Sequence, residues 1–154
     1  MKKLLSAVCL CALAQGVAAQ PPQATGELAE AYVMPVWVDA VTEVCPWKSP
    51  SAEGYIRLIR REHDDGSHGL YVQWIRKGIA GEPAEAVSTL AVEELDQQLM
   101  LRLEMPQPTL ARDACRLKSF GEDMVNERRY ELDMLVRGPG ELQVNITRKL
   151  DGGV

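Results

Sequence analysis

Apolar and polar residues alternate with a period of two along most of this chain, a pattern typical of half-buried β-strands. The first strand is predicted to begin at Val36, with even-numbered residues on one face and odd-numbered residues on the other. It is expected to end before Pro46 and Pro50, because proline removes a hydrogen-bond donor from a strand. Further strands are predicted at residues 99–105, 114–120, 128–137 and 141–149.

A β-hairpin is predicted from two apolar runs at residues 55–62 and 70–77. Between them, Asp65, Gly66 and Gly69 favour the positive φ angles of a tight reversal. Pairing Glu62 with Leu70 places one set of side chains on the core face of the hairpin: Ile56, Leu58, Val72 and Trp74. The opposite, half-exposed face then carries Tyr55, Arg57, Ile59, Arg61, Tyr71, Gln73, Ile75 and Lys77.

A second hairpin is expected near the end of the chain, where Gly138-Pro139-Gly140 joins the last two predicted strands. In it Leu132, Met134 and Val136 face Leu142, Val144 and Ile146 or their neighbours.

Residues 84–98 fit two patterns. Their leucine spacing fits a helix, but the branched residues of 86–92 favour a strand that ends in an acidic turn, and we favour the strand.

About eight short strands with turns between them predict an all-β fold. We expect an antiparallel two-sheet sandwich, with a small β-barrel as the alternative. Cys45 and Cys115 are predicted to form one structural disulfide, because their wide separation does not suit a redox pair.

The first nineteen residues have the pattern of an export signal: Lys2 and Lys3, an apolar run from Leu4 to Ala14, and small residues up to Ala19. The apolar run is shorter than the about 20 residues that a membrane-spanning helix needs. We therefore expect residues 1–19 to be removed, 20–31 to be a disordered linker, 32–150 to form a single domain and 151–154 to be a flexible tail. Such a protein would be periplasmic or secreted, and Cys9 and Cys11 would leave with the signal.

The 135 residues that remain carry 15 Lys and Arg against 22 Asp and Glu, a net charge of −7. This balance disfavours nucleic acid and anionic membrane as partners. No second apolar run is long enough to span a membrane.

One candidate binding site is the half-exposed face of the first hairpin, where cations and aromatic rings come together: Tyr55, Arg57, Arg61, Tyr71 and Lys77. Guanidinium groups and flat rings suit contact with a carboxylate, a sugar or a peptide. An ordinary solvated sheet face can have the same composition.

The hairpin turn offers a candidate metal site, because it holds both histidines of the chain and two acids: His63, Asp64, Asp65 and His68. Imidazole and carboxylate groups together can ligate Zn²⁺ or a similar ion. The spacing matches no established zinc motif, and Asp-Asp-Gly-Ser is typical of a turn that bonds its own backbone.

No catalytic motif and no cofactor motif is present, so the sequence does not indicate an enzyme. We predict an exported, non-catalytic binding or accessory module of the cell envelope, which acts through protein or peptide contacts as an inhibitor, adaptor or chaperone. A sheet edge that accepts a partner's strand is one mechanism by which it could act. The alternatives are a metal-dependent enzyme or metal carrier that uses His63 and His68, and a structural subunit of an envelope assembly.

Overall fold

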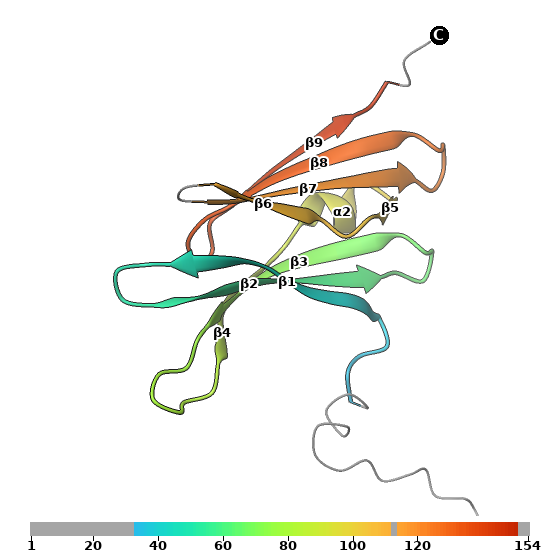
Figure 1. Cartoon of the computed structure of the whole chain (residues 1–154). Helices are drawn as coiled ribbons and strands as arrows, with labels where there is room; N and C mark the ends of the chain where they lie inside the picture. The colour runs from blue at the N-terminus through green and yellow to red at the C-terminus, as the bar shows by residue number, and fades with distance from the viewer. Residues whose placement is uncertain (1–32, 112–113, 151–154) are drawn as a thin grey trace, which may run out of the picture. The chain divides into compact units, whose positions relative to one another are not determined.

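The computed structural model of the chain describes residues 33–111 and 114–150. The expected export signal, the expected linker and the expected C-terminal tail lie outside these residues. Within them the chain forms two antiparallel β-sheets that do not close into a barrel (Figure 1). The predicted two-sheet sandwich is thus confirmed, and the barrel alternative is wrong.

Nine strands make up the two sheets in the described part of the chain. Sheet A contains, in spatial order, β1 (Val38–Lys48), β2 (Glu53–Glu62), β3 (His68–Arg76) and β4 (Glu85–Ala91). Sheet B contains β5 (Leu101–Leu103), β6 (Gln107–Ala111), β7 (Ala114–Asp123), β8 (Arg129–Val136) and β9 (Leu142–Arg148). Strands β7, β8 and β9 are neighbours in that order, and β5 and β6 pair with different parts of β7. The short helix α2 (Glu93–Gln97) lies in the connection between the sheets.

A β-bulge in β1 changes which side chains face the core. The register against β2 shifts between Glu43 and Cys45, after which Cys45 and Trp47 are buried. The strand continues through Pro46 to Lys48, so the prediction that it ends before Pro46 is wrong. Because β1 is an edge strand, a proline without an N–H group is tolerated there.

The first predicted hairpin forms from β2 and β3, with a register that differs from the predicted one. Glu62 pairs with His68 rather than with Leu70, so His68 and Gly69 belong to β3 and not to the turn. A shift of two residues leaves every side chain on its predicted face, whereas a shift of one would not. The four predicted core residues are accordingly buried: Ile56, Leu58, Val72 and Trp74.

The other predicted elements differ from the structure mainly in their ends. Residues 84–98 form strand β4 followed by α2, so the favoured strand is confirmed for their first half. Strand β5 is shorter than the predicted 99–105, and β6 was not expected because its segment contains Pro108. The last hairpin has the predicted pairs, with Leu132 opposite Ile146 and Met134 opposite Val144.

One hydrophobic core lies between the sheets and includes the side chains of both. The Cys45–Cys115 disulfide joins β1 of sheet A to β7 of sheet B, as predicted. Trp74 is fully buried, and its indole N–H donates to the carbonyl oxygen of Arg137 at 2.9 Å. None of the helices in the described residues is long and apolar enough to cross a membrane.

Candidate functional site

The predicted binding residues lie on the face of sheet A that points away from the core. We use the name outer face of sheet A for Trp37 together with the outward side chains of β2 and β3: Tyr55, Arg57, Ile59, Arg61, Tyr71 and Gln73. All of them are at least partly exposed. Lys77 lies just beyond β3, at the opposite end of the hairpin from Arg61, and is exposed. The structure therefore brings four of the five predicted residues onto one surface and leaves Lys77 at its border.

Three side chains of this surface form a cluster, which we call the Trp37 cluster: Trp37, Arg61 and Tyr71. The guanidinium carbon of Arg61 lies 5.5 Å from the centre of the Trp37 ring. The Trp37 and Tyr71 rings are 6.4 Å apart and inclined at 51°. The segment before β1 is held there because the carbonyl oxygen of Trp37 accepts a hydrogen bond from Glu62 at 2.9 Å. Even so, Trp37 keeps 42% of its surface exposed, so the cluster remains open to solvent.

Arg61 is a fixed cation in this cluster. Its hydrogen bond to the Tyr71 hydroxyl raises the pKa of Arg61, and the charges of Asp96 and Asp64 add to that effect against the opposing effect of burial. The distance from Arg61 Nη1 to the Tyr71 oxygen is 3.5 Å, which is long for a hydrogen bond. Its Nε is buried and has no partner among the described residues. Arg61 can donate hydrogen bonds to an incoming acceptor through its other guanidinium N–H groups, not through the buried Nε.

Arg57 is held in position by a chain of side-chain contacts across three strands. Its guanidinium donates to Gln73 of β3, through Nε at 2.9 Å and also through Nη2. Gln73 in turn donates to the Thr89 hydroxyl of β4 at 2.9 Å. Because the Arg57 guanidinium is oriented before any partner arrives, a contact made through it loses less side-chain entropy.

The structure does not bring the four predicted metal ligands together. Asp65 accepts hydrogen bonds from the hydroxyl and the backbone N–H of Ser67, and these bonds lower the pKa of Asp65. His63 Nε2 lies 3.2 Å from a carboxylate oxygen of Asp96 in α2. In residues 33–111 and 114–150, no three side chains of His, Cys, Asp or Glu are grouped as a metal site requires. The metal hypothesis stays a prediction, without a ligand set in this geometry.

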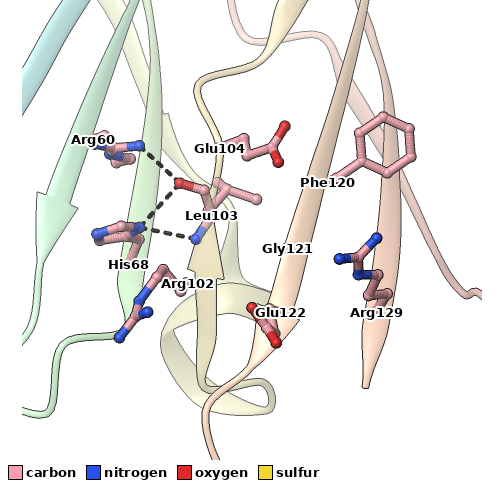
Figure 2. A pocket seen from close by; sticks show the side chains of 9 residues that line it. All are labelled: Arg60, His68, Arg102, Leu103, Glu104, Phe120, Gly121, Glu122 and Arg129. Carbon is pink, nitrogen blue, oxygen red and sulfur yellow. Dashed lines mark hydrogen bonds between the residues drawn. The ribbon is translucent and has the colours of Figure 1, made fainter. Parts of the chain in front are cut away.

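His68 instead connects the two sheets. Figure 2 shows His68 and Arg60 of sheet A pointing at the backbone of Leu103 in β5. His68 Nδ1 lies 2.9 Å from the Leu103 N–H nitrogen and 3.1 Å from the Leu103 carbonyl oxygen, and Arg60 Nη1 donates to that oxygen at 2.7 Å. Because Arg60 already supplies a donor to the carbonyl, Nδ1 is assigned as the acceptor of the Leu103 N–H. We call this arrangement the Leu103 clamp. The clamp satisfies the backbone N–H and C=O groups of Leu103, which are buried and point away from β7.

The neutral form of His68 fits the Leu103 clamp. A ring nitrogen that accepts a hydrogen bond from an N–H group cannot itself carry a proton. Burial of the imidazole, and then the positive charge of Arg60, lower the pKa of His68, while Asp39, the Leu103 carbonyl and Glu62 oppose them. The clamp is therefore a structural contact, not a set of free metal ligands.

A cleft of about 560 Å³ lies beside the Leu103 clamp and is the second candidate surface (Figure 2). Strand register places Arg102, Glu122 and Arg129 opposite one another on three neighbouring strands along it. Glu104 also lines the cleft. Acidic and basic side chains alternate in this row, so the cleft offers no single charge to a ligand.

No protein-family model, curated protein or solved structure matches this chain. The choice of a functional surface therefore depends on geometry. The outer face of sheet A combines exposed aromatic rings with arginines, whereas the cleft has arginines and glutamates side by side.

Two parts of these surfaces were not predicted from the sequence. The alternating pattern places Trp37 in the first strand, but Trp37 precedes β1 and packs against Tyr71 two strands away. A large aromatic residue beside the start of an edge strand is the signal that could have drawn attention to it. The Leu103 clamp depends on how the two sheets meet, and no local pattern indicates it.

Proposed function

We propose that this chain is an exported, non-catalytic binding module that holds a protein or peptide of the cell envelope against the outer face of sheet A. The observation that carries the proposal is the Trp37 cluster, in which an arginine and two aromatic rings are assembled and still exposed. Trp, Tyr and Arg are the residues that most often dominate the energetics of protein interfaces.

The chemistry of the surface indicates what kind of partner fits. Arg57 and Arg61 offer oriented donors for a carboxylate, and a charge-assisted bond of this type is stronger than a neutral one. Val41 lies opposite Ile59 in the register of β1 and β2 and is 46% exposed, which adds apolar contact area. A segment that carries an acidic side chain beside an apolar one matches this surface.

The disulfide and the expected export signal support the proposed location. A disulfide between Cys45 and Cys115 is compatible with an oxidising compartment outside the cytoplasm. An inhibitor, an adaptor or a chaperone of the envelope would act there by binding alone.

Reversing the two charges tests the proposal. We expect the double substitution Arg57→Glu and Arg61→Glu to lower capture of the partner by about tenfold or more, as loss of interface hot spots does. The matched control is Arg116→Glu with Arg128→Glu, which makes the same charge change at exposed positions outside both candidate surfaces. Capture is measured in envelope extracts of the producing organism with a photocrosslinking residue in place of Tyr55.

Two results would contradict this function. One is equal capture by both double variants, which would mean that charge on the outer face of sheet A does not matter. The other is the absence of any crosslinked partner when the crosslinking residue is present and Arg57 and Arg61 are unchanged. Thermal unfolding of each variant confirms that it is folded before capture is compared.

A further inference from the structure

The free edges of the two sheets differ in how they are protected against pairing with another strand. Strand β1 has two register shifts and contains Pro46, and β4 has a register shift that leaves Val87 without a partner in β3. Strand β6 contains Pro108, and the edge of β5 is covered by the Leu103 clamp. Bulges, prolines and covering side chains are the usual means by which proteins prevent edge-to-edge association.

Strand β9 has none of these protections. Its seven residues pair with β8 without a register shift, and they include no proline. The Lys149 N–H donates to Arg129, and the Arg137 N–H donates to Glu141. Hydrogen bonding alternates along an antiparallel strand, so the odd-numbered residues of β9 bond to β8. The backbone N–H and C=O groups of the even-numbered residues therefore face the open edge: Leu142, Val144, Ile146 and Arg148.

The apolar layer of the sandwich also reaches this edge. Leu142, Val144 and Ile146 pack against the core but are only partly buried. Outward side chains on the other face of β9 are neutral and polar: Gln143, Asn145 and Thr147. An added strand would thus meet hydrogen-bonding groups along its backbone and apolar contacts on one face.

We propose that β9 pairs antiparallel with β9 of a second copy of this chain, so that the two B sheets become one continuous sheet. Asn145 lies opposite Asn145 of the second copy, and the two-fold axis passes between these two residues. This surface is separate from the outer face of sheet A, so the proposal does not depend on the proposed function.

The sequence of β9 is complementary to itself in this register. Val144 lies opposite Ile146 of the second copy in the apolar layer, and Gln143 lies opposite Thr147 on the polar face. At each end of the paired strands, Glu141 lies opposite Lys149 of the second copy, and no two like charges face each other. Four pairs of even-numbered residues exchange about eight backbone hydrogen bonds in all. A second copy therefore satisfies the open edge without any change in sequence.

Symmetry limits the assembly to two chains. An interface in which both copies use the same surface around a two-fold axis is closed. Because β9 is the one edge in the described residues that lacks protection, the dimer leaves no comparable edge for a third chain.

Cysteine cross-linking tests both the contact and its register. In the full chain, with Cys9 and Cys11 changed to Ser, the substitution Asn145→Cys places two thiols opposite each other. Residues that face each other in such a pair have Cα atoms about 4.5 Å apart, which a disulfide can span. We expect Asn145→Cys to yield a disulfide-linked dimer on non-reducing gels. The matched controls Gln143→Cys and Thr147→Cys should give no disulfide-linked dimer on the same gels, because each thiol would lie about 13 Å from its copy along the strand.

A proline substitution tests the backbone pairing independently. Val144→Pro removes an N–H group that faces the open edge and leaves the bonds to β8 intact, whereas Val144→Thr keeps that group. Light scattering measures the number of chains per particle, at about 100 µM so that a weak dimer is still populated. We expect two chains per particle for the wild type and for Val144→Thr. We expect one chain for Val144→Pro, with an unchanged circular dichroism spectrum.

The proposal is overturned by any of three results. The first is equal cross-linking at positions 143, 145 and 147, which would indicate random collision. The second is a wild-type protein that stays a single chain, which would leave the β9 edge to a strand of another protein. The third is assembly into particles larger than two chains.

Discussion

The two ends of the sandwich are held together by different chemistry. Cys45 lies opposite Ile56 near the start of β2, and its disulfide to Cys115 joins sheet A covalently to sheet B. His68 lies opposite Glu62 at the other end of β2, where the Leu103 clamp joins the sheets by hydrogen bonds. One junction is a covalent bond and the other is a polar contact in a buried environment.

The difference predicts how each junction responds to its surroundings. The disulfide acts mainly by restricting the unfolded chain, and it persists at any pH as long as the compartment is oxidising. The Leu103 clamp is complete only with a neutral imidazole. A protonated Nδ1 cannot accept the Leu103 N–H, and it would have to share the Leu103 carbonyl oxygen, 3.1 Å away, with Arg60. Redox conditions therefore control one end of the sandwich, and pH controls the other.

Among changes to the two junctions, removing the disulfide is expected to lower the free energy of unfolding the most. The bridge closes a loop with a sequence separation of 70 residues. The chain-entropy relation gives a loss of about 4 kcal/mol in the free energy of unfolding for Cys45→Ala with Cys115→Ala. Urea unfolding followed by circular dichroism measures it against the wild type with its disulfide intact. A loss below about 1 kcal/mol would mean that the covalent end contributes little.

The covalent end of the sandwich was predictable from the sequence, and the polar end was not. Alternating patterns indicate strands and their buried faces because side-chain direction in a strand has a period of two. Cys45 and Cys115 are the two cysteines that remain after the expected export signal is removed, so their pairing follows from the compartment. The role of His68 depends on a register two residues away from the predicted one and on the path of β5, which no local pattern shows.

The candidate site shows the same division. Tyr55, Arg57, Arg61 and Tyr71 share one face because they sit at matching positions of two paired strands, and the sequence predicts that. Their organisation into an exposed cluster requires Trp37, which reaches the cluster through a contact outside the regular strands. Such contacts are decided by packing between elements that are distant in sequence.

Replacing the imidazole tests the polar end directly. His68→Phe fills a similar volume but leaves the buried Leu103 N–H without an acceptor. A buried donor that loses its partner costs about 1–3 kcal/mol of stability, less than the loss expected for the disulfide. His68→Asn is the matched control, because its side-chain oxygen can accept from the same N–H and recover part of the loss. The measurement is urea unfolding above pH 7, and equal stability of all three proteins would contradict the clamp.

The smallest expected effect is the pH dependence that His68 adds. Its pKa in the folded protein is lowered from the ordinary 6.5, first by burial and then by Arg60. Below pH 6.5 the unfolded chain takes up a proton at this position while the folded chain does not, which favours unfolding. The contribution of His68 is therefore complete above pH 6.5 and declines as the pH falls from 6.5 toward the lowered pKa of the folded state.

Several charged and polar groups face His68: Arg60 and Glu62 of β2, Asp39 of β1 and the Leu103 carbonyl. The variant His68→Asn keeps all of them, so a difference in slope between it and the wild type reports the imidazole. We expect the free energy of unfolding of the wild type to decrease from pH 7 to about 5 more steeply than that of His68→Asn. The disulfide-free variant should keep the wild-type slope, because its missing junction does not titrate. Parallel pH profiles for wild type and His68→Asn would show that the ring does not stay neutral in the fold.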